Sequence, residues 1–273
     1  MRRWGEALVV NGLLAAGALL CAAPLLWMVS VSLMPAGEAT AFPPALWPSA
    51  PTLEHYRELF TRLELARFAA NSAILALLAT AIGLVTNSLA AYAFAKLRFA
   101  GRDRLFRLLL VGLVVPGQVA MLPLFLFLKQ LGLVNTYAGV LVPSLASIFG
   151  IFLIRQYLLS IPDSLLDAAR LDGASELRIW ASIAMPLARP ILVTFATFSF
   201  MGSWNDFLWP LIVLSGEDRQ TLPVALANLL GEHAMDVELL MAGSVLTLLP
   251  VVLLFLALQR HYVRGILAGS VRG

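Results

Sequence analysis

Six apolar windows constrain this chain of 273 residues more than any other feature. A transmembrane helix needs about 20 consecutive, mostly apolar residues, and six windows meet that requirement. Prolines and glycines inside them are compatible with spanning helices, because neighbouring helices satisfy the backbone groups that such residues free. The pattern predicts an all-α, polytopic membrane protein with six transmembrane helices in a single domain, residues 1–273. The windows cover residues 7–31, 69–94, 105–128, 138–158, 190–214 and 239–258.

The composition supports this class and excludes several others. Hydrophobic residues make up 60% of the chain and charged residues 13%, whereas soluble domains are about half apolar and a quarter charged. The single cysteine, Cys21, excludes intrachain disulfides and any CxxC metal site. The three histidines are too scattered to form a metal pair, and a net charge of +3 is too small to indicate nucleic-acid binding. We therefore expect no metal, no catalytic cluster and no nucleic-acid partner.

The distribution of basic residues predicts the orientation in the membrane. Of the 19 lysines and arginines, 14 lie in four alternate segments: the amino terminus, the stretch "KLRFAGRDRLFR", the end of the fourth window with the loop after it, and the carboxyl tail. Basic residues concentrate on the cytoplasmic side of membrane proteins. Both termini are therefore expected in the cytoplasm. The apolar run from Ala7 to Leu33 is too long for the core of a signal peptide, which indicates a retained first span.

The loop after the fourth window carries a charged insert, "IPDSLLDAARLDGASELRIWASIAMPLARP". A first helix capped by Asp163 is expected to begin at Ser164. Gly173 supplies the flexible position that a tight turn requires, and Ser175 is expected to cap a second helix. The residues predict a helix–turn–helix over 163–186 on the inner face of the membrane. Two interpretations remain open: an amphipathic connector that packs on its own lipid and helices, and a docking surface for a cytoplasmic partner.

The spacing of the insert resembles the EAA loop of ABC-importer permeases, which reads E-A-A, three residues, G, nine residues, I-x-L-P. Aspartate replaces glutamate at the first position, which keeps the charge on a shorter side chain, and methionine replaces leucine with a similar volume. In that family the loop is a coupling helix seated in a groove of a separate ATPase subunit. The resemblance implies this coupling role for Asp167, Ala168, Ala169, Asp172, Gly173, Ile183, Met185 and Pro186.

Four further stretches resemble the carbohydrate branch of these importers, the maltose-type second permease. They are residues 42–60, 91–102, 202–214 and 260–273, so the resemblance covers nearly the whole chain. It implies a permease subunit of the inner membrane that moves a sugar or related solute by alternating access. The implied partners are a homologous second permease, two ATPase subunits, an extracytoplasmic solute-binding protein and the lipid bilayer.

The chain lacks the sequence needed to bind ATP by a P-loop. That motif requires a Gly-Lys pair followed by Ser or Thr, but Lys96 and Lys129 are followed by Leu97 and Gln130. ATP and magnesium are therefore expected on the partner ATPase, with no cofactor bound by this chain. The alternative is a secondary, ion-coupled transporter, which would need a coupling-ion site and usually internal repeats.

The fifth window contains the polar stretch "SFMGSWNDFLWP". An ionisable side chain inside a span costs about 2.5–3.5 kcal/mol, so Asp206 is expected to face the bundle interior or water. One interpretation is the lining of a translocation path, and the other is hydrogen bonding between helices. The candidates for the substrate path are Ser203, Trp204, Asn205 and Asp206, with Gln118, Asn87 and Asn71 as further candidates in or beside spans.

Overall fold

The computed structural model describes residues 2–43, 45–232 and 236–270, and the side chains of 10–43, 45–229 and 236–257. Every regular element within these ranges is a helix. The helices group into two compact units, Met1–Ala66 with Ala225–Val252 and Arg67–Val224 with Leu253–Gly273. The boundaries fall inside the helices α3, α13 and α14. The single domain expected over residues 1–273 stays a prediction.

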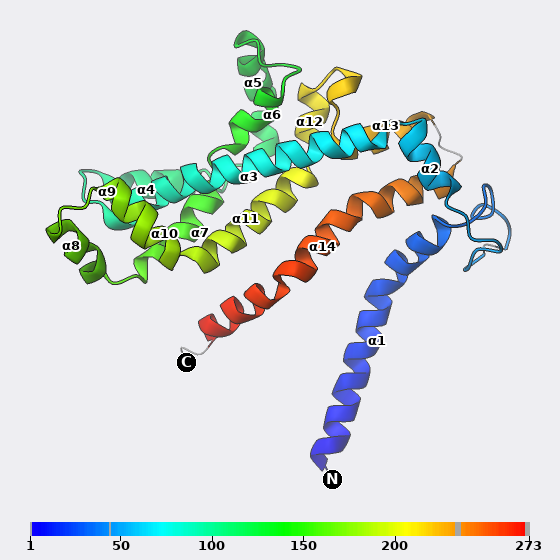
Figure 1. Ribbon diagram of the computed structural model, residues 1–273, viewed down its shortest axis with the longest axis horizontal. Helices are drawn as coiled ribbons and strands as arrows, with labels where there is room; N and C mark the ends of the chain where they lie inside the picture. The colour runs from blue at the N-terminus through cyan, green and yellow to red at the C-terminus, as the bar shows by residue number, and fades with distance from the viewer. Residues whose placement is uncertain (1, 44, 233–235, 271–273) are drawn as a thin grey trace. The chain divides into compact units, whose positions relative to one another are not determined.

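The first unit contains α1 (Arg2–Val31), α2 (Glu54–Thr61), most of α13 (Leu222–Glu232) and the first half of α14 (Val237–Ser270) (Figure 1). Its helix α1 is continuous and exposes most of its apolar side chains, as a helix surrounded by lipid would. The segment between α1 and α2 is held by polar contacts. His55 Nε2 lies 2.9 Å from the Met34 carbonyl oxygen, and the Ala39 amide donates to the buried Glu238 carboxylate.

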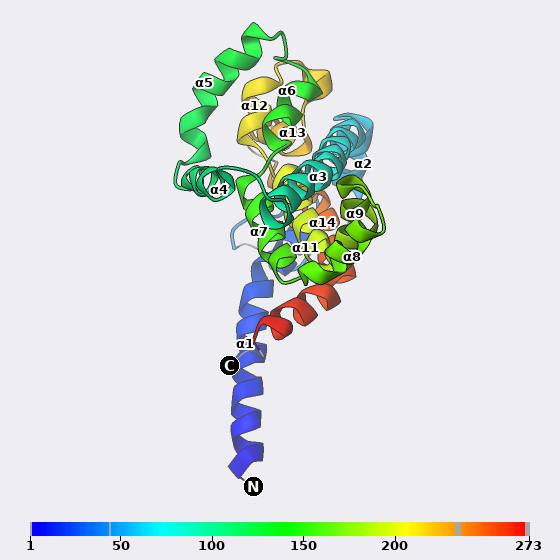
Figure 2. The same ribbon diagram turned by 90° about the vertical axis from the view of Figure 1, so that its left-hand side faces the viewer.

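The second unit is built along α3 (Leu65–Lys96). Its other elements follow in chain order: α4 (Arg102–Val111), α5 (Gly117–Gln130), α6 (Tyr137–Leu141), η1 (Val142–Ser144), α7 (Ile148–Leu159), α8 (Asp163–Leu171), α9 (Glu176–Ile179), the π-helix η2 (Trp180–Ala184), α10 (Met185–Leu187), α11 (Arg189–Trp204), α12 (Leu208–Val213) and η3 (Glu217–Arg219). In both views α8 and α9 lie at the carboxyl-terminal end of α3 (Figure 1, Figure 2).

Two hydrophobic clusters form along α3. The cluster near its carboxyl end contains Ala91, Tyr92 and Ala95 of α3 together with residues of α4, α7, α8, α9 and α11. The cluster nearer its amino end contains Leu75 of α3 together with residues of α5, α6 and α12, including Trp209. Helix α3 therefore connects the region around α8 and α9 with the region around α5 and α12.

Three of the six predicted windows are single helices of spanning length. Helices α1, α3 and α14 include apolar segments of 22, 32 and 21 residues, each long enough to cross a membrane. Two bent helix pairs raise the number of candidate spans to as many as five. These pairs are α6–η1 with α7, bent by 42°, and α9–α10 with α11, bent by 85°.

The other three predicted windows are each divided into shorter helices. Window 105–128 is divided into α4 and α5 by residues 112–116, and window 138–158 is divided before α7. Pro116 explains the first break, because proline has no amide hydrogen and disfavours helix at the residue before it. Ser147 explains the start of α7, because its hydroxyl caps the new helix by accepting from the Gly150 amide. Window 190–214 is interrupted after α11, next to Asp206.

Candidate functional site

The charged insert forms two short helices that meet at a glycine turn. Helix α8 begins at Asp163, one residue earlier than expected, with Pro162 in the N-cap position. The expectation that Asp163 caps α8 is wrong, because its carboxylate instead contacts Lys96. Gly173 has φ +81°, a left-handed conformation that strains any residue with a Cβ. The Ser175 hydroxyl caps α9, as the sequence predicted, by accepting from the Arg178 amide at 3.4 Å.

A lysine at the end of α3 fixes the start of α8. Lys96 Nζ donates to the Ile161 carbonyl at 2.7 Å and to Asp163 Oδ1 at 2.5 Å. The Lys96 side chain is only 3% exposed, whereas that of Asp163 is 72% exposed. The hydrogen bond from Lys96 holds the pKa of Asp163 below its ordinary value. The ion pair therefore joins α8 to a helix 67 residues away in the sequence.

A second set of contacts joins α9 to α3 and to α8. The Tyr92 hydroxyl of α3 donates to Glu176 Oε2 at 2.6 Å. Arg170 Nε donates to Glu176 Oε1 at 2.7 Å, and another guanidinium nitrogen of Arg170 donates to Asp167 Oδ1 at 2.7 Å. Hydrogen bonding with Arg170 lowers the pKa of Glu176, and hydrogen bonding with Glu176 raises the pKa of Arg170. These bonds close the two short helices against each other around the Gly173 turn.

We call α8, the Gly173 turn and α9 the clamped loop. The side of the loop away from α3 is exposed and partly apolar: Leu171 is 89% exposed and Leu177 is 64% exposed, and Leu165 is also exposed. Leu166 instead is buried in the cluster around Ala91. An exposed apolar patch rimmed by charges is typical of a protein–protein contact surface.

The predicted coupling residues fall into an exposed group and a packed group. Ile183 and Met185 pack against the cluster at the carboxyl end of α3, through the π-helix and α10. Pro186 is exposed within α10, and the chain turns by 85° between α10 and α11. A π-turn inside a helix often marks a functional site. The exposed group on the clamped loop is Asp167, Ala168, Asp172 and Gly173, with Ala169 half-buried beside it.

A separate cavity of about 540 Å³ lies among α3, α5, α6, α7, α11 and α12. Two of the predicted path residues, Ser203 and Asp206, line it. Asp206 sits where α11 ends, and its carboxylate accepts weakly from the Trp209 amide at 3.4 Å. The irregular backbone between α11 and α12 thus lies beside a cavity, which is where a membrane protein tolerates such backbone.

The four other predicted path residues do not line this cavity. Trp204 is buried and stacks on Phe200 with ring centroids 6.0 Å apart, and Asn205 is exposed with its amide donating to the Met201 carbonyl. Gln118 is exposed on α5. Asn87 is buried and accepts from the Ser147 amide at 2.7 Å, so it joins α3 to the start of α7.

Asn71 likewise connects segments, since its amide donates to the carbonyls of Asp218 and Gln220.

Sequence reasoning missed Lys96 and Tyr92, whose partners lie 67 and 84 residues away. The stretch 91–102 contained both, but no local pattern pairs them with the insert. Among the described residues, no group of three or more His, Cys, Asp or Glu side chains could hold a metal ion.

Apolar helices of spanning length, a clamped charged loop and a cavity between helices define a membrane transport subunit. The chain belongs to the family described as "Binding-protein-dependent transport system inner membrane component", whose profile matches residues 79–268. This family is the permease component of ABC importers, and ATPase activity resides in a separate subunit. The chain is thus a transport subunit of the inner membrane and not an enzyme.

Named relatives agree with this assignment. The chain is 40% identical over 227 residues to the arabinooligosaccharides transport system permease protein AraQ of Halalkalibacterium halodurans, covering 83% of this chain and 81% of the relative. It is 34% identical over 277 residues to the lactose transport system permease protein LacG of Rhizobium radiobacter, covering 100% and 98%. The chain also superposes on a chain of a solved bacterial ABC transporter involved in the import of the acidic polysaccharide alginate. The TM-score is 0.84 at 25% identity, and the match covers 93% of this chain and 95% of the solved chain.

Proposed function

We propose that this chain is the permease of an importer for a sugar or oligosaccharide, coupled to its ATPase through the clamped loop. The relatives named for arabinooligosaccharides, lactose and alginate support the substrate class. The proposed partners are a homologous second permease, two ATPase subunits that bind ATP and magnesium, and an extracytoplasmic solute-binding protein.

One observation carries the coupling role: the loop is fastened to α3 on one side and exposed on the other. Lys96 and Tyr92 of α3 hold α8 and α9, while Leu171 and Leu177 face outward. Exposed leucines gain nothing in water, so the loop is expected to bury them against lipid or in another subunit. A loop that docks in a groove of another subunit would bury them there. The fastened side would then pass movement of that subunit to α3.

We propose six spans, with both termini and the clamped loop in the cytoplasm. The helices α1, α3 and α14 supply three spans, and the bent pairs that contain α7 and α11 supply two more. The broken pair α4 and α5 supplies the sixth. The basic residues of alternate loops support this orientation.

We further propose that the cavity lined by Ser203 and Asp206 is part of the translocation path. It offers a carboxylate, hydroxyl groups and the aromatic rings of Phe198 and Trp209. Polar groups that bind hydroxyls and aromatic faces that pack against rings suit a carbohydrate. Asn87, in contrast, joins α3 to the start of α7, and Trp204 is buried and stacks on Phe200 of its own helix.

The decisive experiment replaces the turn glycine in the assembled transporter. Proline cannot adopt the φ of +81° at Gly173. Proteoliposomes that hold the permeases, the ATPase subunits, internal ATP and external binding protein should lose sugar uptake with Gly173→Pro, while the chain still inserts into membranes. Uptake should not require a proton or sodium gradient.

Gly132→Pro is the matched control. Gly132 has φ +68°, follows the end of α5, and its amide donates to the carbonyl three residues earlier, as the Gly173 amide does. The same strain outside the clamped loop should leave uptake in place. Normal uptake by Gly173→Pro, or equal loss in both variants, would contradict the coupling role.

A further inference from the structure

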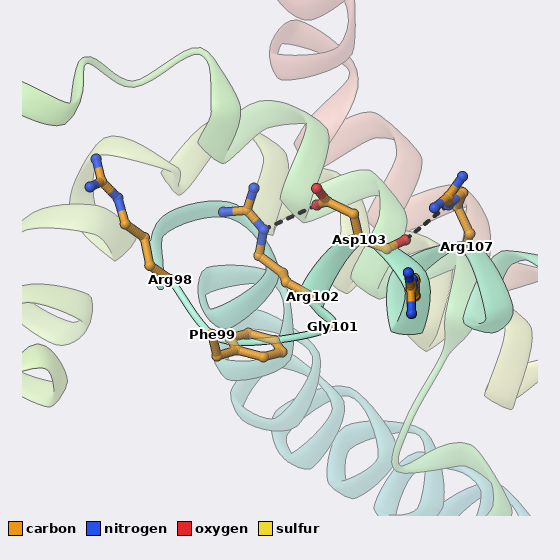
Figure 3. A pocket seen from close by; sticks show the side chains of 7 residues that line it. Arg98, Phe99, Gly101, Arg102, Asp103 and Arg107 are labelled. Atoms are coloured by element: carbon orange, nitrogen blue, oxygen red, sulfur yellow. Dashed lines mark hydrogen bonds and ion pairs between the residues drawn. The ribbon is translucent and has the colours of Figure 1, made fainter.

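The connection between α3 and α4 forms a second, strongly basic cavity that the transport function leaves unexplained. Its volume is about 550 Å³. We call it the arginine cavity. Figure 3 shows Arg98, Arg102 and Arg107 spaced along the connection and the first turns of α4, with Asp103 between the last two. The lining residues are Arg98, Phe99, Gly101, Arg102, Asp103, Arg104 and Arg107.

The residues that line the cavity carry an excess of positive charge. Four arginines face one carboxylate, and Asp103 pairs with Arg102 Nε at 3.1 Å. Arg107 Nε donates to the backbone carbonyl of Asp103 at 3.3 Å. Within the described part of the chain, no carboxylate forms an ion pair with Arg98 or Arg104. Both guanidinium groups are exposed and free of a direct ion pair with any described carboxylate, although Arg98 also lines a neighbouring pocket with Asp163, Asp167 and Glu176.

Exposed apolar side chains lie next to these arginines. Helix α4 is anchored on one side by Phe106, which is buried and lies under the guanidinium of Arg155 at 3.9 Å from the ring centroid. Leu105 and Leu108 on the same helix are 51% and 68% exposed, and Phe99 is exposed at the rim of the cavity. An anion that fits this surface carries apolar chains beside its charge.

We propose that the arginine cavity binds the phosphate of an anionic phospholipid headgroup, with the acyl chains lying against Leu105 and Leu108. Guanidinium groups suit phosphate oxygens because they donate paired hydrogen bonds. The cavity lies directly after α3, a helix of spanning length, so it is placed at the surface of the bilayer. Basic clusters next to a membrane span attract anionic lipid. The exposed leucines favour a lipid over a free phosphate ion. This site does not depend on the coupling role of the clamped loop.

The test uses the assembled transporter in vesicles of phosphatidylcholine that contain a photoactivatable phosphatidylglycerol. After irradiation and digestion, mass spectrometry should find the label on peptides covering residues 98–107. The double variant Arg98→Gln/Arg104→Gln should lower this labelling about tenfold, because each basic side chain near the bilayer surface strengthens attraction to anionic lipid several-fold. Raising the salt concentration should also lower it.

The matched control is Arg57→Gln/Arg62→Gln, which removes the same charge from two exposed positions, one on α2 and one at its C-cap. It should leave the labelling of 98–107 unchanged. Equal labelling by a photoactivatable phosphatidylcholine, or labelling that persists in the double variant, would overturn the proposal. Loss of labelling when inorganic phosphate is added before irradiation would also overturn the proposal, by showing that the site binds the free ion. Crosslinking of 98–107 to an acidic segment of another subunit would overturn it in favour of a protein contact.

Discussion

Replacing Asp163 by asparagine should loosen the clamped loop more than removing the lysine that binds it. The two members of this ion pair differ in burial: the Lys96 side chain is 3% exposed and that of Asp163 is 72% exposed. Asp163→Asn leaves a buried ammonium without its counter-charge, because the Ile161 carbonyl and the new amide oxygen are neutral acceptors. Lys96→Met removes the buried charge and leaves a carboxylate that water can hydrate.

The magnitudes follow from this asymmetry. Breaking a fully buried ion pair from one side costs about 3–5 kcal/mol. Asp163 is largely exposed and the Ile161 carbonyl remains, so we expect about 2 kcal/mol for Asp163→Asn, or about thirtyfold in the opening equilibrium of α8. Lys96→Met should cost about 1 kcal/mol, or roughly fivefold, which is the net value of a hydrogen bond. The double variant should resemble Lys96→Met, because no charge remains buried.

Hydrogen exchange of the assembled transporter measures these differences directly. Amides in peptides covering residues 161–172 should exchange faster in the order wild type, Lys96→Met, Asp163→Asn. Peptides from α2 serve as an internal reference, because α2 makes no described hydrogen bond to this region. The reasoning would be refuted if Lys96→Met exposed α8 as much as Asp163→Asn, or if the double variant were worse than either single variant.

Three other predictions follow from the same structure. Asp206→Ala should change the KM of sugar uptake while the amount of assembled transporter stays constant, and uptake kinetics equal to wild type would reassign Asp206 to helix packing. Gly150→Val should cost about 1–3 kcal/mol of stability and lower the amount of folded transporter in the membrane, because any Cβ there overlaps the ring of buried Phe195. Gly17→Ala in α1, where the surrounding space is open, should leave that amount unchanged. Equal yields of the two variants would contradict the close packing at Gly150. The folded pKa values of Asp163 and Glu176 lie below their ordinary values, so the two carboxylates stabilise the loop fully above about pH 5 and lose this effect as pH falls through the folded pKa values. Hydrogen exchange of residues 161–172 should therefore show a constant opening free energy between about pH 5 and pH 8. A fall in the opening free energy within that range would refute this prediction.

Much of the clamped loop was predictable because its signals are local. A glycine at the end of a helix and a serine before the next one predict a turn and a cap from a few neighbouring residues. Gly173 and Ser175 have these roles in the structure. The start of α8 was misplaced by one residue, because the carboxylate of Asp163 is taken by Lys96 rather than by the helix amides. Local signals do not reveal that competition.

The sequence alone determined that the chain is helical, that it is apolar enough for a membrane, and which loop carries the family spacing. Those properties follow from hydropathy and from contacts between residues a few positions apart. Only the tertiary structure decided where three windows break, that Asn87 joins α3 to the start of α7, and that Lys96 and Tyr92 fasten α8 and α9. The reason is physical: apolar content measures a preference for lipid and not the continuity of a helix, and a bond between residues 67 or 84 positions apart exists only once the helices have packed.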